Sequence, residues 1–251
     1  MRISGRTIAL WGLAFSTVLG STALGSTAWA QRRDSFGLGA PRSAGTGGAT
    51  RWGEGCQIAL FAPEGGGRSA TDQPTLFWYG SPAGSEPINL TLILRDADSN
   101  TAQRIFQVTG TVATKGTYQF TLPTALQSGQ TQRWDVRGAG AGCPQGQVVA
   151  TMAVRYEPNE VLNRAIAAAR TDLERARIYA RAFYWYDALA AYERAIAANP
   201  TNREIRQERR ALLSQGLKEG DKEMTAAKLK DILNTTDQAP ASVFAAKTPT
   251  P

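Results

Sequence analysis

The pattern of apolar and polar residues changes once along the chain, near residue 158. Before that point, short runs typical of β-strands alternate with clusters of glycine, proline, serine and asparagine that are typical of turns. The predicted strands cover residues 56–62, 75–79, 88–95, 102–108, 117–122, 132–137 and 147–156. Short strands at this spacing predict an immunoglobulin-like β-sandwich over residues 51–157.

Alternation within the runs indicates which residues share a face of the sandwich. Leu90, Leu92 and Leu94 fall on one face of their strand, and the even-numbered apolar residues from 148 to 154 fall on one face of the last strand. Trp78 is expected to point away from the face that carries its two aromatic neighbours. These side chains predict a core between two half-buried sheets.

After residue 158 the composition is rich in alanine, leucine, arginine and glutamate, which predicts helices over residues 158–234. The spacing of small and aromatic residues resembles a single tetratricopeptide repeat, a pair of packed helices about 34 residues long. The positions that carry this likeness are Ala176, Tyr179, Ala188, Tyr192, Ala195 and Pro200. The predicted fold is therefore α+β, an N-terminal antiparallel immunoglobulin-like β-sandwich followed by a C-terminal helical hairpin or bundle.

One repeat cannot bury its apolar face alone, so the hairpin is expected to pack on the sandwich. We expect the aromatic residues 183–186 to form the junction, with an exposed groove for a partner as the alternative for the cluster from Tyr179 to Tyr192. Asp187 begins the second helix and is interpreted as a helix cap, with a general acid as the alternative.

The two ends of the chain have compositions that predict no packed core. Arg2 and Arg6 precede an apolar stretch over residues 8–19, and Ala28-Trp29-Ala30 fits a cleavage site, so residues 1–30 are interpreted as a signal peptide cleaved after Ala30. Residues 31–50 are rich in glycine and arginine and predict a flexible linker. Residues 235–251 are interpreted as a disordered tail. The mature chain is expected in the periplasm or outside the cell, without a transmembrane anchor.

Composition excludes several kinds of chemistry. The chain has no histidine, so Ser-His-Asp and Cys-His nucleophiles and imidazole metal sites are excluded. The net charge of +7 is spread along the chain without a basic stripe and stacking aromatics, so no nucleic acid is expected as a partner. Cys56 and Cys143 are predicted to form a disulfide, because an exported chain with two cysteines meets an oxidising compartment and the two strands near them are expected to run side by side.

One segment has the spacing of a calcium ligand set. Asp96, Asp98 and Asn100 supply oxygen ligands at the spacing that opens a calcium loop. Thr101 replaces the expected glycine and Gln107 replaces the expected bidentate glutamate, so the segment is interpreted as an ordinary polar turn. We expect no bound metal and no cofactor.

Several motifs together resemble a known family. They are Leu60-Phe61-Ala62-Pro63, Asp72-Gln73-Pro74-Thr75-Leu76-Phe77-Trp78-Tyr79, Gly116-Thr117-Tyr118, Arg133-Trp134, Tyr184-Trp185-Tyr186-Asp187-Ala188-Leu189 and Leu212-Leu213. In this order they resemble the exported cyanobacterial family called domain of unknown function 928. The resemblance covers about residues 51–217 and implies export from a cyanobacterial cytoplasm. It implies no catalytic residue, because the family has no assigned activity.

These features favour a non-catalytic binding or adaptor module of the cell envelope with a protein partner, rather than an enzyme. The alternatives are a structural or assembly protein of the envelope and a hydrolase that uses carboxylates. A binding module predicts an exposed apolar patch on the hairpin, whereas an enzyme predicts a polar cleft with acids of shifted pKa. The candidate partner-binding residues are Trp185, Arg194, Arg203, Arg206, Arg209 and Arg210. The alternative for these arginines is a solvated helix face.

Overall fold

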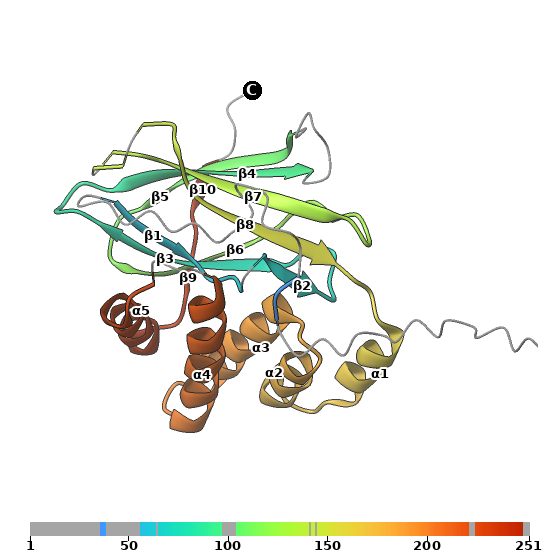
Figure 1. Ribbon diagram of the computed structural model, residues 1–251. Helices are drawn as coiled ribbons and strands as arrows, with labels where there is room; N and C mark the ends of the chain where they lie inside the picture. Colours follow the sequence, from blue (N-terminus) through green and yellow to red (C-terminus); the bar gives the residue numbers. More distant parts are fainter. Residues whose placement is uncertain are drawn as a thin grey trace, which may run out of the picture. The chain divides into compact units, whose positions relative to one another are not determined.

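The strands build two sheets that pack face to face, as the alternation of apolar residues predicts (Figure 1). The computed structural model describes residues 36–38, 56–63, 65–96, 104–140, 142–143, 145–220 and 224–247. Among these residues the first sheet has the order β1-β3-β6-β9 and the second the order β10-β5-β4-β7-β8-β2. The strands are β1 (Cys56–Leu60), β2 (Gly67–Ser69), β3 (Thr75–Pro82), β4 (Ile88–Asp96), β5 (Arg104–Val112), β6 (Gly116–Thr121), β7 (Thr131–Ala139), β8 (Val148–Tyr156), β9 (Ser242–Val243) and β10 (Ala246–Lys247).

The core between the sheets consists of the alternate apolar residues that the pattern identified. Leu90, Leu92 and Leu94 are buried on β4, and Trp134 of β7 is fully buried opposite Leu94. Trp78 points inward and stacks on Tyr118, whereas its neighbours on β3 face the other way. The predicted fold class is confirmed. The prediction for Val148 is wrong, because the pairing register of β7 and β8 shifts between residues 136 and 137 and leaves Val148 exposed.

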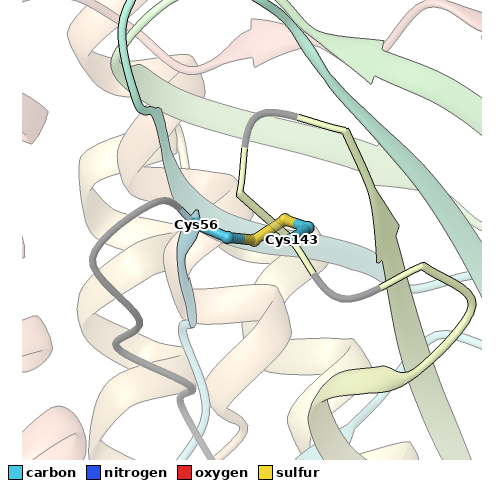
Figure 2. Close-up of a disulfide and its surroundings, with 2 residues drawn as sticks. All are labelled: Cys56 and Cys143. Atoms are coloured by element: carbon cyan, nitrogen blue, oxygen red, sulfur yellow. A yellow bond between two sulfur atoms is a disulfide. The ribbon is translucent and has the colours of Figure 1, made fainter.

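The order of the strands is that of an immunoglobulin-like sandwich in which the first strand is divided between the sheets. β1 pairs with β3 in the first sheet, and β2 then pairs in parallel with the last long strand, β8, in the second. The expected parallel pairing of first and last strands is therefore made by β2, which the strand pattern missed. Cys56 at the start of β1 and Cys143 in the β7–β8 turn form the predicted disulfide, with their Cα atoms 4.8 Å apart (Figure 2).

The helices lie on the outer face of the sheet that contains β3 and β6 (Figure 1). They are α1 (Glu160–Ala168), α2 (Asp172–Arg181), α3 (Trp185–Ala198), α4 (Arg203–Gly220) and α5 (Ala226–Gln238). α3 contacts β2 and β3, and α5 contacts β6. The Tyr79 hydroxyl donates to Asp231 of α5 at 3.0 Å, because Tyr79 is on the outward face of β3. None of the described helices is long and apolar enough to cross a membrane.

α3 docks on the sandwich through two aromatic side chains at its start. The indole N–H of Trp185 donates to the Phe61 carbonyl at 2.8 Å, and the Tyr186 hydroxyl donates to the Ala153 carbonyl at 2.8 Å. Both rings are fully buried. The predicted docking through residues 183–186 is confirmed, because the start of α3 forms a junction with the sandwich.

Two glycines make this docking possible. A Cβ atom at position 67 of β2 would lie 2.9 Å from the Trp185 Cβ, and one at position 216 of α4 would overlap the indole ring. Neither residue can carry a side chain without moving α3. The close packing of α3, α4 and the sandwich therefore depends on Gly67 and Gly216.

The structure corrects the predictions for both ends of the chain. The predicted tail is ordered to residue 247: α5 extends to Gln238, and β9 and β10 then add to the two sheets. Phe244 anchors this segment between Trp78 and Phe120. The composition of this segment did not predict an ordered structure, because the buried side chains within residues 241–247 are those of Ala241 and Phe244. Two buried residues do not produce a recognisable apolar pattern.

At the other end, the predicted signal peptide and most of the predicted linker lie outside the described residues. Phe36 is the exception to the predicted flexibility, because its ring is buried against Phe183 and Trp185. The described residues all belong to one compact unit, Arg33–Pro251.

Candidate functional site

A groove lies where α3 crosses the ends of β3 and β6. It consists of two adjoining cavities of about 390 and 360 Å³, which share Thr75, Ala190 and Arg194 in their walls. The first is completed by Gln119, Thr121, Glu193, Ala197, Pro240 and Ala241. The second is completed by Thr71, Asp72, Gln73, Tyr179, Tyr186 and Asp187. We call these two cavities the α3 groove.

The helical period of α3 places one stripe of residues along this groove. Asp187, Ala190, Arg194 and Ala197 are spaced by three or four residues, so they lie on one face of the helix. Two alanines flank the arginine on this face and leave the space that larger side chains would fill. The groove therefore forms because this face of α3 carries small residues after the aromatic residues at the start of the helix.

Asp187 lies at one end of the stripe and ties α3 to the sandwich. Its Oδ2 accepts from the Ala70 backbone N–H at 2.8 Å, and its Oδ1 accepts from the Thr71 hydroxyl at 3.2 Å. Burial raises the pKa of Asp187 to about 6, against the opposing effect of these hydrogen bonds. Asp187 lies in the first turn of α3 and its carboxyl also bonds to its own backbone N–H, as expected of a cap, but its other hydrogen bonds go to the segment that follows β2.

Arg194 is at the middle of the stripe and is the exposed cation of the groove. Its side chain is 54% exposed, and its Nε donates to Asp172 Oδ1 at 3.1 Å. Asp172 also pairs with Arg175 of its own helix. Among the described residues this is the hydrogen bond that Arg194 makes, so its terminal nitrogens remain for solvent or a ligand. A guanidinium in this position can hold a carboxylate.

A buried ion pair fixes the wall of the groove that comes from the C-terminal segment. Arg209 of α4 donates to Glu193 Oε1 at 2.6 Å and to the Thr236 carbonyl at 2.6 Å. The other oxygen of Glu193 accepts from the Ala241 backbone N–H at 3.2 Å. This arrangement holds residues 236–241 against α3. Removing one partner would leave a buried charge unpaired, so this ion pair is important for keeping the wall in place.

Burial contradicts the predicted partner-binding role of Trp185 and Arg209, whereas Arg206 and Arg210 are half-exposed and bond within the fold. Trp185 and Arg209 are fully buried. Arg206 donates to the Pro200 and Asp237 carbonyls, and Arg210 pairs with the Asp237 carboxylate at 2.5 Å. These side chains bond to the end of α5. The helical pattern of the sequence could not predict that α5 packs at this position.

The remaining members of that set are exposed. Arg203 is on the surface at the start of α4. Arg194 lies in the α3 groove, which the sequence did not identify. The signal that could have found the groove is the alternation of alanine and arginine along one face of α3.

The apolar patch that a binding module was expected to expose on the hairpin is not found among the described residues. Their exposed large apolar side chains are scattered: Ile105, Val148, Val161 and Val243. The hairpin instead borders the mixed polar groove. Most of the candidate calcium turn lies outside the residues that the structure describes: Asp98 and Asn100 are not among them, and Asp96 is the last residue of β4. The described residues contain no cluster of three or more acidic or cysteine side chains that could hold a metal.

Comparisons with known proteins identify a family. The family model described as Domain of Unknown Function (DUF928) matches residues 42–225. No curated protein matches the chain. A solved structure of astrotactin-2, titled a conserved vertebrate-specific and perforin-like membrane protein involved in neuronal development, is similar with a TM-score of 0.27 and 10% identity. The match covers 75% of this chain but 37% of the astrotactin-2 chain, and at that TM-score it carries no argument about fold or function.

Proposed function

We propose that this chain, which belongs to the DUF928 family, is a non-catalytic binding or adaptor module of the cell envelope. In this proposal the α3 groove receives an extended segment of a protein partner, and Arg194 binds an acidic group on that segment. The observation that carries the proposal is an exposed guanidinium between two alanines in a groove whose C-terminal wall is held by the Glu193–Arg209 ion pair.

The walls of the groove suit a peptide backbone. Ala190, Ala197 and Ala241 leave room beside the helix, while Thr121 and Gln119 offer hydroxyl and amide groups for hydrogen bonds. The charged group then selects among partners, because a carboxylate on the guanidinium gains a charge-assisted hydrogen bond. Groups of this kind favour recognition of an acidic extended peptide.

The proposal includes an exported location. The signal-peptide pattern of residues 1–30 supports export, and the disulfide between Cys56 and Cys143 fits an oxidising compartment. The family resemblance implies the periplasm or exterior of a cyanobacterium. In the same way we interpret α2 and α3 as a tetratricopeptide-like pair, which the burial of Ala176, Ala188 and Ala195 supports.

A carboxylate-based hydrolase is the main rival, and Asp187 is the residue that favours it. This carboxyl borders the groove and its pKa is raised to about 6, as expected of a general acid. Both of its oxygens, however, accept hydrogen bonds from the segment that follows β2. The carboxyl is therefore better explained as a link between α3 and the sandwich. A purely structural envelope protein would not need the exposed Arg194 in the groove.

The test is capture of envelope proteins by the purified chain and its variants. Arg194→Glu is expected to reduce recovery of the specific partner at least tenfold, because the charge that holds the acidic group is reversed. Asp172→Ala is the matched control, since it removes the same ion pair and leaves Arg194 in place. Equal recovery by wild type and Arg194→Glu would contradict the proposal. Turnover of an envelope glycan or peptide that is lost in Asp187→Asn would establish the hydrolase instead.

A further inference from the structure

We propose that the outer face of the second sheet binds an acidic polysaccharide, through a row of arginines that crosses three neighbouring strands. In the pairing register, Arg95 of β4 lies opposite Arg104 of β5 on one side and opposite Arg133 of β7 on the other. Neighbouring strands are separated by about 4.8 Å, so the row spans roughly 10 Å. This surface is separate from the α3 groove.

The row is unfavourable for folding, which indicates a role in binding. Like charges directly opposite each other on neighbouring strands destabilise a sheet. Asp135 lessens this repulsion: it lies 3.1 Å from the Nε atom of Arg95 and 3.1 Å from that of Arg133. Asp135 is itself held by the Thr151 hydroxyl at 3.2 Å. Asp135 thus contacts both guanidiniums, and Arg104 bonds to the neutral amide of Gln107 at 2.7 Å.

Two more arginines extend the positive charge along the same face. Side chains alternate between the two faces of a strand, so Arg137 shares the face of Arg133 and Asp135 on β7. Arg155 of β8 lies opposite Thr131, whose hydroxyl accepts from it at 2.8 Å, and it also pairs with Glu157 at 3.4 Å, so more of the added positive charge comes from Arg137. The charge that looks diffuse along the sequence is thus gathered on one sheet face. Such a surface attracts a chain with repeated negative charges.

The neutral residues of this face favour a sugar chain over other polyanions. Asn89, Thr91, Thr109 and Thr111 lie on β4 and β5 beside the arginines and offer amide and hydroxyl groups. Sugar hydroxyls can bond to these groups, while carboxylate or sulfate substituents bind guanidinium. The described strand residues of this face include no aromatic ring on which a nucleic-acid base could stack, so nucleic acid fits poorly.

The arginines of the row reach solvent to different extents: the side chains of Arg95 and Arg133 are 22% and 27% exposed, and Arg104 is exposed. The main helix contacts are with β3 and β6 of the first sheet and with β2, which lies at the edge of the second sheet beyond β8, rather than with β4, β5 and β7 (Figure 1). A polysaccharide bound here and a peptide bound in the α3 groove would occupy different sides of the protein. An adaptor that links an envelope protein to an acidic glycan requires this arrangement.

The test is binding of polygalacturonate by the purified chain, measured by calorimetry, with neutral dextran as the uncharged control. We expect binding that weakens with salt and falls at least tenfold in the double variant Arg104→Gln/Arg133→Gln. A matched double variant, Arg170→Gln/Arg203→Gln, removes two exposed arginines, one between α1 and α2 and one at the start of α4, and is expected to bind as the wild type does. Should the first double variant fail to fold, Arg104→Gln alone removes an exposed side chain and is expected to weaken binding severalfold.

Three results would overturn the proposal: no binding of polygalacturonate by wild type, equal losses in the two double variants, or binding of single-stranded DNA as tight as that of the glycan. Arg194→Glu is expected to leave polygalacturonate binding unchanged. The experiments can therefore contradict the proposal for the polysaccharide face without contradicting the proposal for the α3 groove, and the reverse.

Discussion

Replacement of Asp187 by asparagine is expected to change how stability depends on pH. The folded carboxyl has a pKa of about 6, against 3.8 in a model peptide, because burial penalises its charged form. The unfolded chain therefore releases this proton at lower pH than the folded protein does. The contribution of Asp187 to stability is fully present below pH 3.8 and is lost as the pH rises through about 6.

The size of this effect follows from the shift. Each unit of pKa difference corresponds to about 1.4 kcal/mol, so ionisation of Asp187 costs the folded state about 3 kcal/mol, of which roughly 2 kcal/mol is lost between pH 4 and 7.5. Asparagine does not titrate. Its amide oxygen can accept from the Ala70 N–H while its NH₂ group donates to the Thr71 hydroxyl, so the link to the sandwich is preserved.

The assay is urea unfolding of the wild type and Asp187→Asn at several pH values. The free energy of unfolding of the variant, minus that of the wild type, is expected to rise by roughly 2 kcal/mol between pH 4 and 7.5. Taking this difference cancels the other titrating groups, which the two proteins share. A difference that is constant over this range, or that falls with pH, would refute the assignment of Asp187 as a buried carboxyl whose ionisation destabilises the folded protein.

The remaining predictions concern the contacts that join the parts of the fold. Trp185→Ala is expected to lower the free energy of unfolding by about 3–5 kcal/mol, because it removes a fully buried ring and its hydrogen bond to the sandwich; calorimetry that shows an unchanged melting temperature would disprove the docking. A thiol reagent added to the unfolded, unreduced protein should detect no free thiol, and two reactive thiols would show that Cys56 and Cys143 are not bonded. Phe244→Ala is expected to destabilise the chain by about 3 kcal/mol in urea unfolding, whereas Val243→Ala, at an exposed position, should change stability by less than about 0.5 kcal/mol. Equal effects of these last two would mean that Phe244 is not an anchor.

Local patterns were sufficient for the parts of the fold that depend on periodicity. Alternation along β4 identified Leu90, Leu92 and Leu94 as core residues because a strand has a period of two residues. The aromatic start of α3 was correctly expected at the junction, since a single helical hairpin has to cover its apolar face. The disulfide followed from compartment and strand order rather than from any local geometry.

Contacts between distant, short or polar segments could not be read from the sequence. β2 has three residues and no apolar alternation, and its pairing with β8 is made by backbone groups. The bond from Ala70 to Asp187 joins residues 117 positions apart. Without it, Asp187 resembles a helix cap.

The contacts that the arginines make within the fold could not be predicted for the same reason. Arg206, Arg209 and Arg210 lie at helical spacing that is typical of a solvated or partner-binding face. In the fold they bond to the end of α5, and Asp237 is the residue that they share. Conversely, Arg95 and Arg133 are far apart in the sequence, and the sheet brings them into one row. Helical period alone cannot show which face another segment will cover.

Site-specific photo-crosslinking tests the central claim, that the α3 groove binds a protein partner, most directly. A photoreactive amino acid at position 197 would lie in the groove wall, and one at position 198 would also be exposed on α3 but would not line the groove. Irradiation of each protein with envelope extract is expected to give a discrete crosslinked partner from position 197, weaker or absent from position 198, and lost when Arg194→Glu is added. Equal crosslinking from both positions, or crosslinking at 197 that survives Arg194→Glu, would contradict the claim.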